Sequence, residues 1–494
     1  MRISLLLLAL PAALAAQSDN RARELDRYTA QAVRDWNAPG LSIAVVHDGR
    51  VAFAKGYGVL DVGRATPVDT QTLFAVGSTT KAMTTMALAM LVDDGKLAWD
   101  DPVTKHLPDF QLSDPYVTRE VTVRDLLTHR AGLPNADFLW SWNDLPSDEV
   151  IRRVRYVRPA YSLRSSFIYQ NIMYAVAGEV VRAASGMSWA EFLRTRIWQP
   201  LGMTRTVATL AEAARASNVA TPHATVRDTL RTISSNSVDA VASAGSVWSS
   251  AADMAKWIGF LLDSGSVGGR RLLKRETFAE LVRPQTHVPP DEFYPTAQLT
   301  RPHWTTYGLA WFQQDYRGRK IDYHTGSIDG MVAIVGLLLD ERIGVVVLSN
   351  ASQSNLRHAL MLKTFDLFTG AAARDWSQDL KKLYDSLATR GAAQQRNATA
   401  QRATGTRPSL ELARYAGTYS DSLFGTRVVT FEDGTLRMRA SSRSIATLSH
   451  WQYDSFQARW EQPWRGTSMV TFTIGPAGVP SRLEQGSASF RRVR

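Results

Sequence analysis

Gly77-Ser78-Thr79-Thr80-Lys81 decides how this chain is interpreted, because it places a hydroxyl and an amine three residues apart. Residues at that spacing lie on one face of a helix. From Lys81 to Val92 the chain is apolar almost all round, which predicts a buried helix closed by Gly95. Ser78 would lie at the first turn of this helix, where unpaired backbone N–H groups favour the alkoxide form of its side chain. Lys81 would lie one turn deeper, where burial disfavours its charged form.

Two further motifs follow in chain order. Tyr169-Gln170-Asn171 is the only Y-x-N in the chain, and an apolar run typical of another buried helix comes directly after it. His324-Thr325-Gly326-Ser327 leads into two short β-branched runs, 331–339 and 343–348, which predict a strand hairpin in a buried sheet. A second H-x-G, at His47-Asp48-Gly49, lies in a tight turn, so we assign it to a hairpin alone. Each motif by itself is more often structural than catalytic, but their ordered combination indicates an active site.

The ordered set S-x-x-K, Y-x-N and H-T-G resembles the serine penicillin-recognising hydrolases. Within them it is similar to the group of class C β-lactamases, D-aminopeptidases, D,D-carboxypeptidases and related esterases, over about residues 20 to 370. The segments 126–134 and 249–257 resemble that group's secondary motifs. The resemblance implies an α/β (α+β) fold: an antiparallel sheet flanked by helices, plus a helical subdomain, with the site between them. One departure is that no K-[ST]-G occurs; His324 fills the place, as in peptidase and esterase members.

The resemblance assigns the catalytic roles to Ser78, Lys81 and Tyr169. A free serine is a poor nucleophile without an adjacent base. Lys81 and Tyr169 would share proton transfer, and the sequence leaves open which of them is the base. Asn171 would orient Lys81 and the substrate amide.

The third motif supplies the supporting residues. The backbone N–H groups of Ser78 and Ser327 would form the oxyanion hole, with Gly326 beside them. His324 would donate a hydrogen bond to Tyr169 or to a substrate carboxylate, and its ordinary pKa of ~6.5 would impose a protonation step near neutral pH. Asn355 is considered for the substrate rim.

The composition limits which partners the protein is expected to bind and in which compartment it is expected to act. The 494 residues contain no cysteine and are 45% hydrophobic, and the net charge is +11. The basic residues are scattered and no nucleic-acid-binding signature occurs, so we expect no nucleic-acid partner. The nine histidines show no ligand spacing, so we expect no metal and no cofactor. Arg2 and the apolar run 3–16 predict a signal peptide that is cleaved, so we expect a secreted or periplasmic protein. Because this run is too short to span a bilayer, we expect no transmembrane segment.

The composition also divides the chain. We expect a signal peptide at 1–16, a hydrolase domain at 17–372, a helix and linker at 373–409, and a β-rich domain at 410–494. Asp375 to Leu387 is typical of a helix, and 391–409 is typical of an exposed linker. The segment 412–419 resembles the opening of a lipocalin-like domain, and the strand spacing beyond it predicts a small antiparallel sheet or barrel. We interpret this domain as a lid or dimerisation module, which leaves open a homo-oligomer.

These observations together predict a secreted serine hydrolase. It would act through a Ser78 ester on a small-molecule or short-peptide substrate, namely an amide of a D-amino acid or a small ester. A genuine class C-like β-lactamase is the first alternative, and a non-catalytic cell-envelope binding protein is the second. Because the catalytic domain has its own buried elements, a chain ending near Thr406 is expected to fold and to keep its chemistry.

Overall fold

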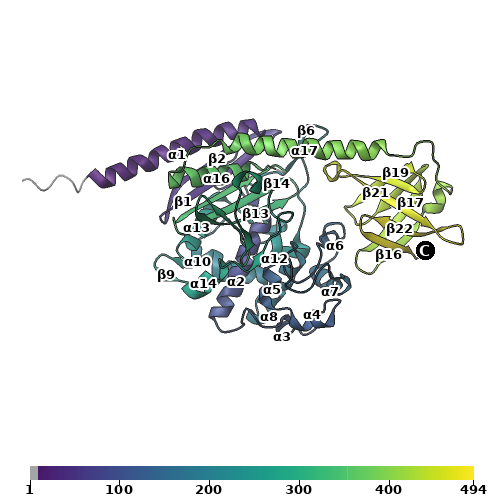
Figure 1. The fold of residues 1–494 in the computed structure, drawn as a ribbon, viewed down its shortest axis with the longest axis horizontal. Coiled ribbons are helices and arrows are strands. Elements are labelled where there is room, and N and C mark those ends of the chain that lie inside the picture. Colours follow the sequence, from purple (N-terminus) through teal and green to yellow (C-terminus); the bar gives the residue numbers. More distant parts are fainter. Residues whose placement is uncertain (1–8, 353, 494) are drawn as a thin grey trace, which may run out of the picture.

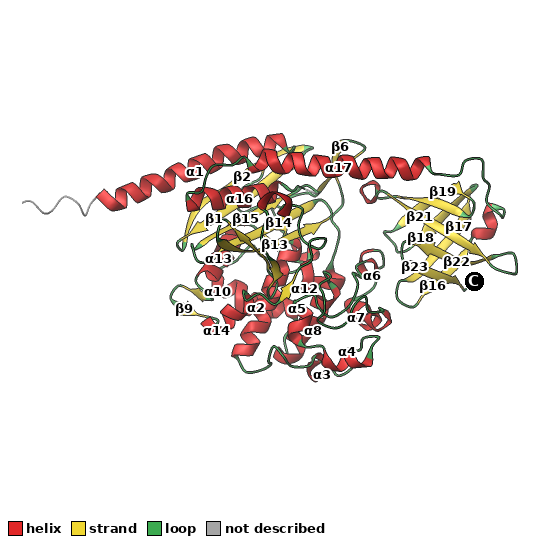
Figure 2. Cartoon of the chain, in the orientation of Figure 1, coloured by secondary structure: helices red, strands yellow, loops and turns green. Residues whose placement is uncertain are grey.

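A nine-stranded antiparallel sheet forms the centre of the larger of two domains (Figures 1 and 2). This computed structural model describes residues 9–352 and 354–493. In spatial order the strands are β10 (Thr286–His287), β11 (Thr305–Tyr307), β12 (Phe312–Tyr316), β13 (Arg319–Ile328), β14 (Met331–Leu338), β15 (Ile343–Ser349), β1 (Gly40–His47), β2 (Arg50–Asp61) and β3 (Arg64–Pro67). The predicted hairpin is confirmed as β14–β15. The second H-x-G is confirmed as the β1–β2 turn, where Asp48 and Gly49 have φ of 49° and 74°.

The sheet is buried on both faces, which explains why its central strands are apolar without alternation. In β1, Ala44 and Val46 belong to one hydrophobic core, and Ile43 and Val45 belong to the other. Helices α1 (Ala9–Asp35) and α16 (Leu356–Thr369) pack on one face. Helix α13 (Ala251–Leu262) packs on the other face, together with the helical subdomain.

Helix α2 (Thr80–Asp93) is the central element of the helical subdomain, and it is surrounded by protein on every side. It packs against α8 (Ile172–Ser185) and α12 (Ala242–Gly245), so an apolar sequence with no polar face is what its position requires. Gly95, with φ of 71°, follows the helix end. The predicted buried helix and its stop are therefore confirmed.

The connection between the two domains differs from the sequence-based prediction. Helix α17 spans Trp376–Ala400, so residues 391–400, which we expected to be linker, continue the helix (Figure 1). The reason is that alanine, glutamine and arginine are strong helix formers even where no apolar face is buried. At the other end of the chain, residues 1–8 of the predicted signal peptide lie outside the described residues, and residues 9–16 begin α1.

Eight antiparallel strands close into a barrel at the C-terminal end (Figure 2). The predicted antiparallel β-rich domain is confirmed as this barrel. Its strands, each paired with its neighbours in sequence, are β16 (Gly417–Asp421), β17 (Gly425–Glu432), β18 (Thr435–Arg439), β19 (Ile445–Gln452), β20 (Ser455–Trp460), β21 (Thr467–Ile474), β22 (Pro480–Gln485) and β23 (Ala488–Arg492). In such a barrel alternate turns share one end, and turns 422–424, 440–444 and 461–466 all contact the larger domain.

Candidate active site

Ser78 and Lys81 meet as the sequence predicts. Ser78 lies in a single 3₁₀ turn, Gly77–Thr79, which leads directly into α2. Lys81 Nζ is 3.0 Å from Ser78 Oγ, 2.6 Å from Asn171 Oδ1 and 2.9 Å from the carbonyl oxygen of Ala244. The latter two oxygens can only accept hydrogen bonds, so a neutral amine uses both of its N–H groups on them. Its lone pair is then directed at the Ser78 hydroxyl.

Burial makes the neutral form of Lys81 accessible. The side chain has no solvent exposure, and this desolvation lowers the pKa of Lys81 to about 7, while the charge of Asp137 acts to raise it. An amine that titrates near neutral pH can accept a proton from a hydroxyl held at hydrogen-bonding distance. The sequence left two candidates for the base, and this geometry favours Lys81.

Tyr169 shows the opposite shift. Burial raises the pKa of the Tyr169 phenol well above its ordinary value, and the nearby Ser78 side chain partly opposes the rise. Within the residues that the structure describes, no protein atom completes a hydrogen bond to its hydroxyl. Tyr169 is therefore a neutral phenol with its proton free to donate, and Lys81 Nζ lies 4.8 Å from the centre of its ring.

Two glycines bring the Ser78 turn against strand β13. A Cβ on Gly326 would lie 1.8 Å from the carbonyl oxygen of Val76 and 3.0 Å from the backbone nitrogen of Ser78. A Cβ on Gly77, whose φ is 53°, would lie 2.6 Å from the backbone nitrogen of Ser327. The absence of side chains here lets the Ser78 and Ser327 N–H groups lie close enough to share one oxyanion.

Replacing Gly326 with alanine is expected to separate these two donors. The new Cβ would overlap the Val76 carbonyl, so β13 must move away from the Ser78 turn. Losing one oxyanion donor costs roughly 10²- to 10³-fold in kcat. The measurement is kcat alongside the melting temperature, with Gly391→Ala, in open space on α17, as the control. An unchanged kcat in Gly326→Ala would show that this close approach does not serve catalysis.

His324 lies in the site but makes contacts other than those predicted. Its Nδ1 is 2.6 Å from the Thr325 carbonyl oxygen, so Nδ1 carries the hydrogen and Nε2 accepts from the Tyr307 hydroxyl at 3.1 Å. Tyr307 in turn lies 3.2 Å from His129 Nε2, and His129 Nδ1 accepts the backbone N–H of Gln170. Both nitrogens of His324 are thus occupied by protein, and it makes no hydrogen bond to Tyr169.

The predicted protonation step of His324 near neutral pH is therefore wrong. Burial, with a smaller contribution from the charge of Lys81, lowers the pKa of His324 to about 3. Instead of holding a carboxylate, the neutral ring ties β13 through Tyr307 and His129 to the segment that carries Tyr169 and Asn171.

We accordingly expect kcat/KM for a neutral ester to show one acidic limb, and that limb to belong to Lys81. Because the amine must be neutral to accept a proton, activity should rise as the pH rises through about 7 and then level off. His324→Gln should lower the plateau but leave the limb in place. A limb that disappears in this variant would return the titration to His324.

An aromatic pocket opens on one side of Ser78. Its volume is about 360 Å³, and Ser78, Tyr169, Asn171, His324 and Ser327 share it with residues to which the sequence assigned no role. These additional residues are Glu292, Phe293, Tyr294, Pro295, Phe312 and Thr325. The segment 292–295 lies in a long loop without periodicity, so no local pattern marks it.

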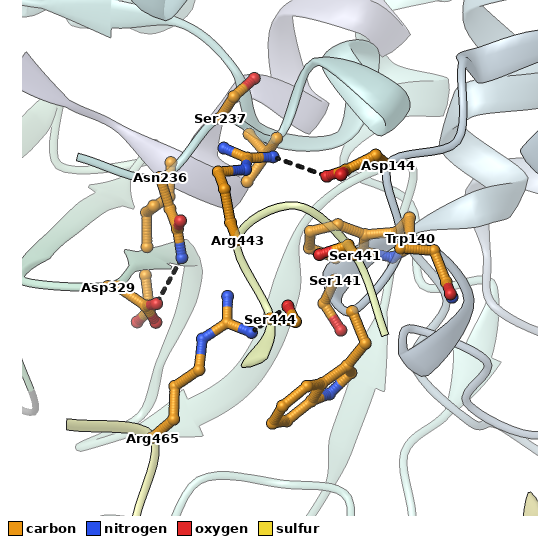
Figure 3. A pocket seen from close by; sticks show the side chains of 15 residues that line it. Trp140, Ser141, Asp144, Asn236, Ser237, Asp329, Ser441, Arg443, Ser444 and Arg465 are labelled. Carbon is orange, nitrogen blue, oxygen red and sulfur yellow. Dashed lines mark hydrogen bonds and ion pairs between the residues drawn. The ribbon is translucent and has the colours of Figure 1, made fainter. Parts of the chain in front are cut away.

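A second pocket, which we call the interface pocket, lies between the two domains (Figure 3). Its volume is about 310 Å³, and Arg443 and Arg465 of the barrel face residues 140–144, 236–238 and 327–329 of the larger domain. Arg443 pairs with Asp144 at 3.7 Å, and Arg465 donates to Ser444 at 3.2 Å. A small space beside Ser78 shares Trp140, Val238 and Ser327 with this pocket. The barrel therefore lines one of the two approaches to the nucleophile, a position that a lid can occupy.

Asn355 lies away from the aromatic pocket. It precedes α16 and lines a third cavity together with Arg357 and Ser327. Arg357, which the sequence did not indicate, is buried and donates to the Gly326 carbonyl at 2.5 Å and to Ser327 Oγ at 3.0 Å. These two hydrogen bonds stabilise the C-terminal end of β13.

Two kinds of feature are absent from the described residues. No group of three or more histidine, cysteine or acidic side chains there is arranged to hold a metal ion. In the same part of the chain, no helix combines the length and apolar character needed to cross a membrane.

Comparisons with known proteins identify what the chain is similar to. The Beta-lactamase family model matches residues 25–364, and a domain of unknown function matches residues 401–491. The unguisins hydrolases of Aspergillus violaceofuscus and Aspergillus campestris are 29% and 30% identical, over 94% and 95% of this chain and 87% and 90% of theirs.

Solved structures show the same fold. The octameric penicillin-binding protein homologue from Pyrococcus abyssi superposes with a TM-score of 0.62 at 22% identity, covering 94% of this chain and 99% of that one. A class C beta-lactamase from Rhodobacter sphaeroides gives a TM-score of 0.56 at 22% identity, over 70% of this chain and 98% of its own. The predicted fold class is confirmed.

Proposed function

The chain belongs to the beta-lactamase family of serine hydrolases, and on this premise we propose that it hydrolyses amide bonds of peptides that carry a D-amino acid, through an ester of Ser78. The observation that carries the proposal is the fully buried Lys81, with Nζ 3.0 Å from Ser78 Oγ and two acceptor-only oxygens on its other sides. A non-catalytic binding protein has no need of a buried, partly neutral lysine at a serine hydroxyl.

The reaction has two acyl-transfer steps. As the Ser78 Oγ–C bond forms, the hydroxyl proton moves to Lys81, and the carbonyl oxygen becomes an oxyanion held by the Ser78 and Ser327 N–H groups. Tyr169 donates its proton to the leaving nitrogen as the C–N bond breaks, and it is reprotonated from Lys81. Water then attacks the ester and gives up a proton to the same groups, and they return a proton to Ser78 Oγ as its bond to the acyl carbon breaks.

Space on both sides of Ser78 favours a peptide over a small ester. The aromatic pocket lies on one side, and the interface pocket, reached past Trp140, lies on the other. A substrate that fills both must extend in both directions from the scissile bond. Preference for a D-residue rests on the resemblance to D-aminopeptidases and D,D-carboxypeptidases. The two relatives named unguisins hydrolases support the choice of a hydrolase.

The test is a screen of the purified full-length protein. It compares D-amino-acid anilides, peptides of increasing length with a D- or L-residue at the scissile bond, short acyl esters and a chromogenic cephalosporin. We expect kcat/KM to rise with length in the D-series and to exceed the matched L-series. Faster turnover of the cephalosporin would favour the β-lactamase alternative, and binding without turnover would favour the cell-envelope binding protein.

We also propose that the chain is exported after cleavage of residues 1–16, and that it forms a homo-oligomer. Export is supported by the apolar N-terminal run. One structural neighbour is described as octameric, which supports the second proposal. N-terminal sequencing of the protein recovered outside the cytoplasm would test the first, since an intact Met1 there contradicts it. Light scattering would test the second, and a monomer contradicts it.

A further inference from the structure

We propose that Asp137 is a positioning residue for the Lys81 amine, and that the C-terminal barrel holds Asp137 in place through the short helix α6 (Phe138–Ser141) that follows it. This inference rests on the proposed hydrolase mechanism. It gives the barrel a part in the chemistry in addition to lining the interface pocket.

The first step is the orientation of Asn171. Asp137 Oδ2 lies 2.7 Å from Asn171 Nδ2, and Asn171 Oδ1 lies 2.6 Å from Lys81 Nζ. A carboxylate can only accept, so the Asn171 amide must turn its NH₂ to Asp137 and its oxygen to Lys81. With the amide reversed, its NH₂ would compete for the lysine lone pair that the Ser78 hydroxyl requires. Asp137 therefore determines which way Lys81 faces.

The second step concerns charge at Lys81. Asp137 is the carboxylate whose charge favours the ammonium form of this lysine. The other titratable groups near the Lys81 amine are Tyr169 and Tyr174, whose ring centres lie 4.8 and 5.2 Å from Lys81 Nζ. The buried histidines His129 and His324 also lie near this amine. Burial raises the pKa of both phenols and lowers the pKa of both imidazoles, so all four are neutral near pH 7. Asp137 is thus the single anion in this set.

The third step is the position of Asp137 itself. Its Oδ1 accepts from Trp140 Nε1 at 2.9 Å, which fixes the carboxylate to α6. Phe138 and Trp142, on either side of that tryptophan in sequence, pack against the core of the barrel. The ring centre of Phe138 is 5.3 Å from that of Phe424.

Further contacts fasten α6 to the barrel. The ring centres of Trp142 and Trp460 are 4.4 Å apart, and Asn143 Oδ1 accepts from the buried Arg427 at 3.2 Å. Conversely, Leu423, in a turn of the barrel, packs against the core of the larger domain. Figure 1 shows α6 on the side of the helical subdomain that faces the barrel. The same segment thus carries barrel-packed aromatics and the carboxylate that orients Asn171.

The experiment measures the rate at which a fluorophosphonate labels Ser78, as a function of pH, in full-length variants. Asp137→Asn keeps an acceptor but removes the charge, so the acidic limb should move to lower pH while the plateau falls only a few-fold. Asp137→Ala also frees the amide of Asn171, so its plateau should fall at least ten-fold. A limb that stays in place in Asp137→Asn overturns the role of Asp137.

The barrel's part is tested with Phe138→Ala and Trp142→Ala, and exposed Phe431→Ala is the barrel control. We expect both variants to lose plateau rate and Phe431→Ala to match the wild type. Phe138→Leu and Trp142→Phe replace any alanine variant that unfolds; each should lose plateau rate to a smaller extent, and a wild-type rate in a folded replacement counts against the link. Wild-type behaviour in Phe138→Ala and Trp142→Ala overturns the link to the barrel. If the wild type is not labelled at Ser78, the proposed function itself fails, which is a distinguishable result.

Discussion

Replacing Ser78 with alanine is expected to lower turnover of every substrate by about 10⁴-fold or more, the scale of nucleophile loss in other serine hydrolases. The physical reason is that no covalent ester can form without Oγ, while the oxyanion donors remain. Because alanine is smaller and the turn it occupies is held by backbone contacts, the melting temperature should hardly change. The measurement is kcat with the best substrate from the screen.

The matched control for Ser78→Ala is Thr79→Ser, one residue away on the same turn, which removes a methyl group and retains the hydroxyl that donates to the Val76 carbonyl at 3.0 Å. Residual turnover in Ser78→Ala comparable to that of this control would contradict the assignment of the nucleophile.

Lys81→Met is expected to reduce turnover nearly as far as the loss of Ser78. Methionine fills the buried space of the lysine stem but has no lone pair of comparable basicity for the Ser78 proton. Because the two residues act as one unit, the double variant Ser78→Ala/Lys81→Met should be no slower than the slower single variant. The measurement is kcat/KM for each single variant and the double variant across pH.

The Lys81 variant also tests the origin of the acidic limb. Any remaining activity in Lys81→Met should lack the limb near pH 7, because the group that produces it is gone. Lys320→Met, at a partly exposed lysine paired with Asp322, is the control for loss of a positive charge. Persistence of the limb in Lys81→Met would show that another group titrates there, and Tyr169 would again become a candidate for the base.

The parts of the fold that sequence predicts are those encoded by local pattern. Helix α2 is apolar all round because protein surrounds it, and the strands β14 and β15 are β-branched runs separated by a turn. The Ser78–Lys81 contact follows from helical spacing alone. Asn171 meets Lys81 because the two helices that follow these motifs pack together, a contact that family resemblance suggested and spacing did not.

The parts that could not be predicted depend on contacts between distant segments. The neutral state of His324 follows from its burial, and the pairing of β11, β12 and β13 brings its hydrogen-bond partner Tyr307 beside it. Likewise, Phe138 and Trp142 have the composition of ordinary core residues, and only the docked barrel shows which core they join. The linker prediction failed for another reason, since an exposed helix needs only helix-forming residues and shows no apolar stripe.

The central claim is that Ser78 forms a covalent ester during turnover, and mass spectrometry of a trapped adduct tests it most directly. The full-length protein is incubated with a fluorophosphonate or a β-lactam, digested, and searched for the modified peptide. The account predicts one equivalent of label, on the peptide that contains Ser78, and none in Ser78→Ala. Label on a different serine, or undiminished labelling of the Ser78→Ala variant, would contradict it.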